Sequence, residues 1–358
     1  MGGDLTIPDS SALMQRGIAL LNAGSEVELR GAVSLFDEAI TIRRTLAVAE
    51  DHWIAYLTAA SWMNRGDALT RLSRVARVES LAEAVRSYDE ALAVLHEVPL
   101  DANPLYRRRR AIAWMNRGIT LQEQGTPESF VEAAASFDRT IETVGENTEH
   151  TIVLACAWMN RGNVLLRIAG SHASEARRSA EKAILLARTA EESDPIAAET
   201  SLKARHILCQ AIAEILAGAP SDEVAGELIP SATDAVEEGL RLARHWEAQG
   251  ETRFSPLLTG LFGFGVAAYR TYLPHFLADF VLENIDSQVP DRASIGLAGQ
   301  REMYSIAVEA LAAAAGELHR DGFASLNTPR FDRLMETLRT LRLIESRARN
   351  LGRVQEGI

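Results

Sequence analysis

An amide side chain followed directly by an arginine recurs four times in this 358-residue chain, each time after a methionine and before a glycine. The four copies are Met14-Gln15-Arg16-Gly17, Met63-Asn64-Arg65-Gly66, Met115-Asn116-Arg117-Gly118 and Met159-Asn160-Arg161-Gly162. An amide offers donors and an acceptor that suit a peptide backbone, and a guanidinium suits a carboxylate or another anion. The recurring chemistry is therefore that of binding and ion pairing.

An acidic residue recurs in step with these arginines, directly after an aromatic residue or an alanine that lies in a second shared pattern. The acids are Asp37, Asp89, Asp138 and Glu181. Because arginine and acid occur together in all four copies, we expect an ion-pair ladder at a semi-buried seam, where unpaired charge is costly. The alternative is that the four arginines form a basic ladder that binds an anionic ligand.

The spacing of these patterns indicates helices that pack in pairs. Tryptophan and glycine four residues apart share one helix face, and so do alanine, aromatic and alanine at steps of four and three. Such a helix pair cannot bury its apolar face alone, so stacked pairs are needed to form a continuous core. We therefore expect an all-α fold of stacked antiparallel helix pairs.

The order of the two patterns resembles the tetratricopeptide repeat (TPR) family, whose pattern is W-x2-L-G-x2-Y…A-x3-F…P. The resemblance covers about residues 11–193 as four divergent repeats, whose motif glycines are 49, 52 and 44 residues apart. Arginine stands where the family has leucine before the glycine, and leucine stands where it has tyrosine after it. The resemblance implies a TPR-like right-handed superhelical solenoid with C-terminal capping helices.

The resemblance also implies a binding surface, because the matching asparagine of the TPR family lies on the concave face and can bond an extended peptide. The predicted partner-binding residues are Met14, Gln15, Met63, Asn64, Met115, Asn116, Met159 and Asn160. For the amides, the alternative is a structural hydrogen bond between repeats. For the methionines, the alternatives are core packing or a groove filled by the protein's own C-terminal helix.

The chain divides by pattern into an N-terminal tail (1–10), a repeat array (11–250) and a C-terminal capping or interaction region (251–358). Further helix pairs are expected at 196–216 with 231–246 and at 254–272 with 274–285, followed by closing helices at 293–320 and 329–351. Residues 328–358 carry seven arginines against four acids around an apolar stripe. Such a basic amphipathic helix suits docking on the acidic array or self-association.

Charge and composition exclude several classes of function. The net charge is −12, which disfavours binding to nucleic acid, and the longest charge-free apolar stretch is too short for a membrane span. Two cysteines make no disulfide framework and the start of the chain has no signal-peptide pattern, so we expect a cytoplasmic protein. Only two of the 37 basic residues are lysines, which hints at a bacterial genome. Gly2 and Thr6 match a loose myristoylation pattern.

Signals for catalysis are weak. The eight histidines form no metal-ligand cluster, and the run Gly260-x2-Gly263-x-Gly265 indicates close helix packing. The run Arg107–Arg110 indicates a solvated helix start, with a local phosphate or acidic-peptide site as the alternative. We therefore expect no enzyme, cofactor or metal, and a scaffold that binds a protein or peptide partner. The alternative is a ligand-gated regulator that binds an anionic small molecule or phosphorylated peptide through the repeat arginines. A third possibility is an enzyme in 251–358, which would need a polar pocket there.

Overall fold

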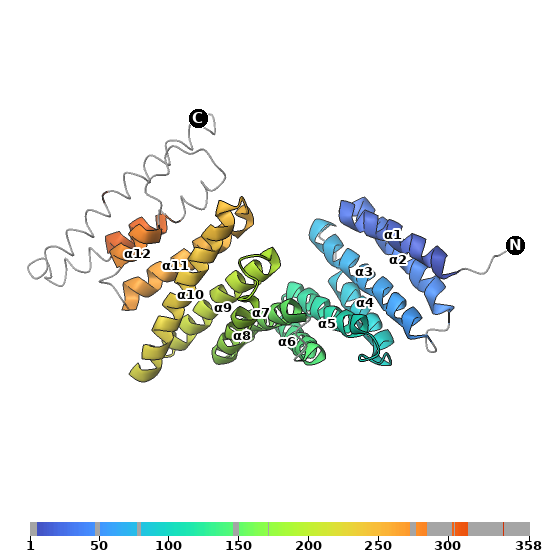
Figure 1. Cartoon of the computed structure of the whole chain (residues 1–358), viewed down its shortest axis with the longest axis horizontal. Helices are drawn as coiled ribbons and strands as arrows, with labels where there is room; N and C mark the ends of the chain where they lie inside the picture. Colours follow the sequence, from blue (N-terminus) through green and yellow to red (C-terminus); the bar gives the residue numbers. More distant parts are fainter. Residues whose placement is uncertain are drawn as a thin grey trace, which may run out of the picture. The chain divides into compact units, whose positions relative to one another are not determined.

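The computed structural model describes residues 6–46, 51–76, 80–145, 150–170, 172–272 and 277–284, together with positions 303, 305–313 and 339. Every regular element within these residues is a helix (Figure 1). The chain forms two compact units, Met1–Glu175 and Ala176–Ile358, which are described one at a time. The predicted all-α class is therefore confirmed.

The first unit consists of consecutive helices that pack in pairs. They are α1 (Ile7–Ala23), α2 (Glu26–Arg44), α3 (His52–Ala76), α4 (Leu81–His96), α5 (Pro104–Gln124), α6 (Pro127–Val144), α7 (Thr151–Leu165) and the first turn of α8 (Ala173–Ala187). Within a pair, α1 packs on α2, α3 on α4 and α5 on α6. Each second helix also packs on the first helix of the next pair, as α2 does on α3. This is the stacking of helix pairs that the repeats predict.

The motif glycines are where the two helices of a pair approach most closely. A Cβ atom added to Gly66 would lie 2.7 Å from Cζ of Tyr88, and one on Gly118 would lie 2.7 Å from Cε1 of Phe137. Gly17 stands in the same relation to Phe36. Because these aromatic rings are fully buried, no side chain larger than hydrogen fits at the glycine positions without a shift.

The helix boundaries follow local sequence signals. Ser25 begins α2 with a capping box, in which its Oγ accepts from the backbone N–H of Glu28 at 3.4 Å and its own N–H donates to the Glu28 carboxylate at 3.0 Å. Gly24 and Gly125 follow the ends of α1 and α5 with φ of 80° and 73°, a left-handed conformation that favours glycine. The two helices of these repeats are thus joined by short, well-marked turns.

The second unit continues with the rest of α8, α9 (Pro195–Ala217), α10 (Asp222–Ala248), a short 3₁₀ helix (Thr252–Phe254), α11 (Ser255–Tyr272) and α12 (Leu277–Asn284). The pair predicted at 196–216 and 231–246 corresponds to α9 and α10. The second helix begins earlier than expected, because Ser221 caps it and Pro230 lies inside it. The pair predicted at 254–272 and 274–285 corresponds to α11 and α12.

One predicted boundary differs from the structure. The N-terminal tail was expected to reach residue 10, but α1 already begins at Ile7 with Pro8 in its first turn. The division predicted near residue 250, between a repeat array and a capping or interaction region, is of another kind than the division into compact units and stays a prediction; α10 packs against α11 within the second unit. The two compact units divide within α8.

Some expectations fall on residues that the structure does not describe. The myristoylation pattern at Gly2, most of the closing helices at 293–320 and 329–351, and nearly all of the basic segment 328–358 lie outside the described residues. Among the described helices, none combines the length and the hydropathy that crossing a membrane requires.

Candidate functional site

The recurring arginines of the inner repeats bind the recurring acids of the preceding repeat. Nε of the arginine lies 2.6 to 2.7 Å from Oδ1 of the aspartate in the pairs Arg65–Asp37, Arg117–Asp89 and Arg161–Asp138. In each pair the acid lies on the second helix of one repeat and the arginine on the first helix of the next. The structure thus forms the expected ion-pair ladder, and the ladder joins neighbouring repeats.

Each ladder arginine also binds the second helix of its own repeat. Arg65 donates to Oγ of Ser87 at 2.8 Å and to Glu83 at 2.5 Å. Arg117 makes the corresponding bonds to Ser136 and Glu132, and Arg161 binds Glu175. Burial opposes the charge of Arg65, but hydrogen bonds with Glu83 and Asp37 outweigh it, so the pKa of Arg65 is raised.

A tryptophan completes the surroundings of each inner arginine. The guanidinium carbon lies 5.8 Å from the ring centroid in the pairs Arg65–Trp62, Arg117–Trp114 and Arg161–Trp158. The three arginine side chains are only 14 to 17 % exposed. Because these guanidinium groups are already bound within the array, they are poorly suited to bind a separate anionic ligand.

The ladder is interrupted at the two end positions, which corrects the expectation of four equivalent pairs. Arg16 lies in the first of the four repeats, and within the described residues it forms no ion pair. Glu181 pairs with Arg177, one turn earlier on α8, at 3.4 Å. The next helix carries a buried arginine, Arg205, but it binds Glu191 and Glu238.

The methionine side chains lie in the core. Met14, Met63, Met115 and Met159 are 7 %, 5 %, 7 % and 8 % exposed. Their burial corrects the expectation of an apolar binding stripe and favours the packing alternative, because side chains this buried offer little area to a partner.

The amides lie nearer the surface and link neighbouring first helices. Gln15 is exposed, and the three asparagines are half-buried. Nδ2 of Asn116 donates to Oδ1 of Asp67 at 3.1 Å, and Nδ2 of Asn160 lies 3.6 Å from Sδ of Met115. Within the described residues the side chain of Asn64 makes no hydrogen bond, and the amide oxygens of Asn116 and Asn160 accept none. Structural bonding therefore uses only part of the capacity of these amides.

Asp67 is a site residue that the sequence analysis missed. Its Oδ1 accepts from the hydroxyl of Tyr88 at 2.5 Å as well as from Asn116, and burial raises the pKa of Asp67. Burial and the nearby carboxylate also raise the pKa of Tyr88. The sequence did carry a signal for this contact. Only the second repeat has an acid directly after its motif glycine, and only the second repeat has tyrosine where the others have phenylalanine or alanine.

The run Arg107–Arg110 is partly bound within the chain. Arg107 pairs with Asp101 and donates to the carbonyl of Thr143 at 3.2 Å. Arg109 donates to the hydroxyl of Tyr56 at 2.5 Å, with its guanidinium carbon 4.1 Å from that ring's centroid. These contacts favour a structural role over a ligand site for two of the four arginines.

A buried arginine joins the first two repeats. Arg43 donates to Oγ of Ser10 at 3.1 Å, to Oγ of Ser61 at 2.7 Å and to the carbonyl of Leu57 at 2.5 Å. Burial, together with the charge of Arg109, lowers the pKa of Arg43 to about 10. The contact shows that the end of α2 reaches the first half of α3.

The described part of the second unit contains an apolar cavity of about 220 Å³ between α9, α10 and α11. Its lining includes Ile212, Val236, Phe264 and Cys209, and burial raises the pKa of the Cys209 thiol to about 12. Gly265 packs against Phe280 and Val236, as expected for close helix packing. The described residues form no cluster of histidine, cysteine or carboxylate side chains that could hold a metal.

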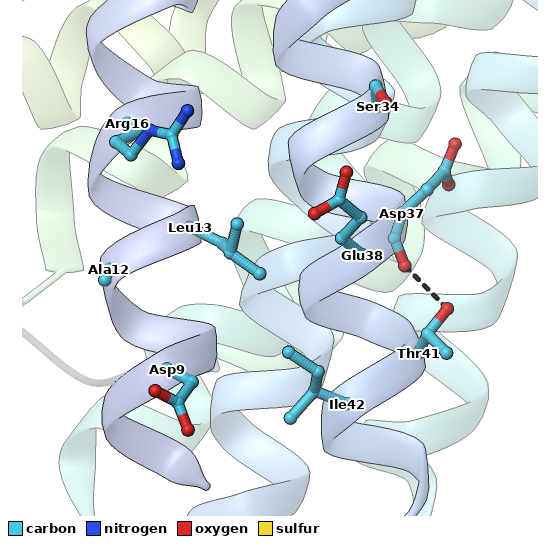
Figure 2. A pocket seen from close by; sticks show the side chains of 9 residues that line it. All are labelled: Asp9, Ala12, Leu13, Arg16, Ser34, Asp37, Glu38, Thr41 and Ile42. Atoms are coloured by element: carbon cyan, nitrogen blue, oxygen red, sulfur yellow. Dashed lines mark hydrogen bonds between the residues drawn. The ribbon is translucent and has the colours of Figure 1, made fainter. Parts of the chain in front are cut away.

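A shallow groove of about 650 Å³ lies between α1 and α2 (Figure 2). Its lining includes Leu13 and Ile42, which are apolar, and the charged side chains of Asp9, Arg16 and Glu38. Arg16, the ladder arginine that forms no ion pair within the described residues, therefore lines a concave surface.

No family model matches the chain, and no curated protein matches it. Solved structures similar to it include a circular tandem repeat protein with novel repeat topology (19 % identity, 98 % of this chain and 85 % of that chain, TM-score 0.44). Others are the de novo designed helical repeat protein DHR64 (16 %, 84 % and 99 %, 0.16) and the TPR domain of P58(IPK) (13 %, 94 % and 99 %, 0.17). The recurring motifs and the stacked helix pairs of the chain itself give one coarse description: this is a helical repeat protein.

Proposed function

We propose that this protein is a non-enzymatic scaffold, a divergent TPR array that binds an extended protein segment across its first helices. The observation that carries the proposal is the row of half-buried asparagines on three successive first helices. Their amide groups keep unused hydrogen-bonding capacity within the described residues. Such a row offers a peptide backbone the same donor and acceptor at regular intervals.

The spacing of the row suits an extended chain. Packed helices lie about 8–10 Å apart, and an extended chain advances about 3.3 Å per residue. Contacts of α3 with α5 and of α5 with α7 place these first helices side by side. Successive asparagines would therefore meet backbone groups about three residues apart.

The chemistry of the partner follows from the charge. Residues 1–250 carry a net charge of −11, which favours a neutral or cationic segment over nucleic acid. The buried methionines shift the source of affinity from apolar anchors to backbone bonding. A cytoplasmic location, a bacterial source and self-association through the C-terminal helices belong to the same proposal.

The alternative of a ligand-gated regulator is less well supported. It needs the repeat arginines to bind an anion, but Arg65, Arg117 and Arg161 already bind two carboxylates each. An added anion would have to displace these partners at a cost in stability.

The test uses peptides selected from a displayed random library on the wild-type chain. Asn64→Ala with Asn160→Ala removes two amides and leaves Asn116 to support Asp67; the control is Arg86→Ala with Glu90→Ala on the exposed face of α4. Losing two backbone hydrogen bonds should weaken binding about tenfold, whereas the control should bind like wild type. Failure to select any peptide, or equal affinity for both variants, would contradict the proposal.

A further inference from the structure

The first repeat has a ladder arginine, Arg16, but lacks the three residues that surround Arg65 within its own repeat. In the second repeat Arg65 binds Glu83 and Ser87 and lies beside Trp62. By the alignment of the repeats, the first repeat has Gly31, Leu35 and Leu13 at these three positions. Arg16 is exposed and forms no ion pair within the described residues.

The side of α1 that carries Arg16 corresponds to an interface in the next repeat. On α3, the carbonyl of Leu57, the hydroxyl of Ser61 and the guanidinium of Arg65 all bind α2. The corresponding positions on α1, 49 residues earlier, are Pro8, Ala12 and Arg16, and all three are exposed. The first helix thus presents the surface that receives a second helix elsewhere in the array.

The groove beside this surface can seat side chains. Figure 2 shows Leu13 and Ile42 between the two helices, Arg16 on one side and Asp9 towards the start of α1. Leu13 is smaller than the tryptophan found at this position in the inner repeats, which leaves more of the groove open. The groove therefore combines an apolar floor with one cation, Arg16, and three acids, of which Asp9 lies on α1 and Asp37 and Glu38 on α2. Oδ2 of Asp9 also caps α1, because it accepts from the N–H and the hydroxyl of Thr6.

The order of these charges matches the way in which α2 binds α3. Asp37 meets Arg65, and Arg43, six residues later on α2, meets the first half of α3. On α1, Arg16 takes the place of Arg65, and Asp9 lies in the first turn, near the position that Arg43 occupies on α3. A helix that packed on α1 in the same way could pair a carboxylate with Arg16 and a basic side chain with Asp9.

We propose that this face of α1, with the groove beside it, is a docking surface for an amphipathic helix of another protein. The helix would lie as the second helix of a preceding repeat, presenting a carboxylate to Arg16, a cation to Asp9 and apolar side chains to Leu13 and Ile42. The proposal rests on continuity with the interface between repeats and on the matching charges. It concerns a different surface from the asparagine row.

The probe is a labelled peptide with the sequence of residues 25–45, which contains α2 with its cap and its terminal arginines. Short isolated helices are marginal, so the protein is titrated to millimolar concentration and binding is followed by fluorescence anisotropy. Arg16→Asp should weaken binding about tenfold, and an Asp37→Arg peptide should restore the affinity for that variant. Arg86→Asp, on the exposed face of α4, is the matched control and should bind like wild type.

Three results would overturn the proposal. The first is no binding of the peptide to wild type. The second is equal affinity for wild type and Arg16→Asp, because a peptide that displaced the chain's own α2 would meet Arg65 instead of Arg16. The third is self-association of wild type that Arg16→Asp abolishes, which would assign the surface to a second copy. The Asn64→Ala, Asn160→Ala variant should bind the probe normally, so failure here is distinguishable from failure of the proposed function.

Discussion

Asp67, Tyr88 and Asn116 illustrate how much of the candidate site depends on single residues. The tyrosine hydroxyl and the asparagine amide bind one buried carboxylate, which joins the second and third repeats. The co-occurrence of arginine and acid predicted the ladder, but spacing alone could not tell whether an arginine pairs within its own repeat or with the preceding one. The burial of the methionines was equally open, because methionine suits both cores and binding surfaces.

The raised pKa of Asp67 predicts a pH dependence of stability. An acid whose folded pKa lies above its unfolded value, ordinarily 3.8, binds its proton more tightly in the folded state. Its ionisation therefore costs stability as pH rises from 3.8 through the raised folded pKa. The free energy of unfolding of wild type, relative to Asp67→Asn, should fall over this interval in denaturant titrations. If the free energy of unfolding of wild type relative to Asp67→Asn stayed constant or rose over this interval, burial would not destabilise the Asp67 carboxylate.

At the scale of elements, the closeness of two helices in a repeat depends on the glycine and the aromatic ring opposite. The sequence predicted these pairs because both patterns recur in order, and α9 and α10 were found from helical periodicity alone. The early start of α10 was missed, since a proline usually lies at or near a helix end whereas Pro230 lies inside this helix. Periodicity thus located the helices better than their boundaries.

Gly118→Ala should destabilise the first unit. The new Cβ would lie 2.7 Å from a ring atom of Phe137, which is fully buried and cannot move away freely. Overpacking of this kind costs about 1–3 kcal/mol, which thermal unfolding followed by circular dichroism can measure. The matched control is Gly226→Ala in α10, where no atom lies within 4 Å of the added Cβ and the better helix former should not lower Tm. Equal effects of the two changes would contradict the packing argument.

At the scale of the whole molecule, the chain comprises two compact units, and the repeat pattern gave no sign of where they divide. The division lies inside α8, a helix whose own sequence continues the repeat without a proline, glycine or linker. The boundary between two compact units depends on how tightly the segments on its two sides pack together. A periodic sequence pattern carries no information on this packing. The scaffold proposal accordingly rests on the first unit, where the asparagine row and the ladder both lie.

The most direct test of that proposal is site-specific photo-crosslinking in cells of the source organism. A photoreactive amino acid replaces Asn64 or Asn160 on the row, or Glu90 on the exposed face of α4 as the control. The proposal predicts that positions 64 and 160 capture the same protein, through neighbouring parts of one extended segment, and that position 90 does not. Capture of nothing from the row, of unrelated proteins from its two positions, or of the same protein from position 90 would contradict it.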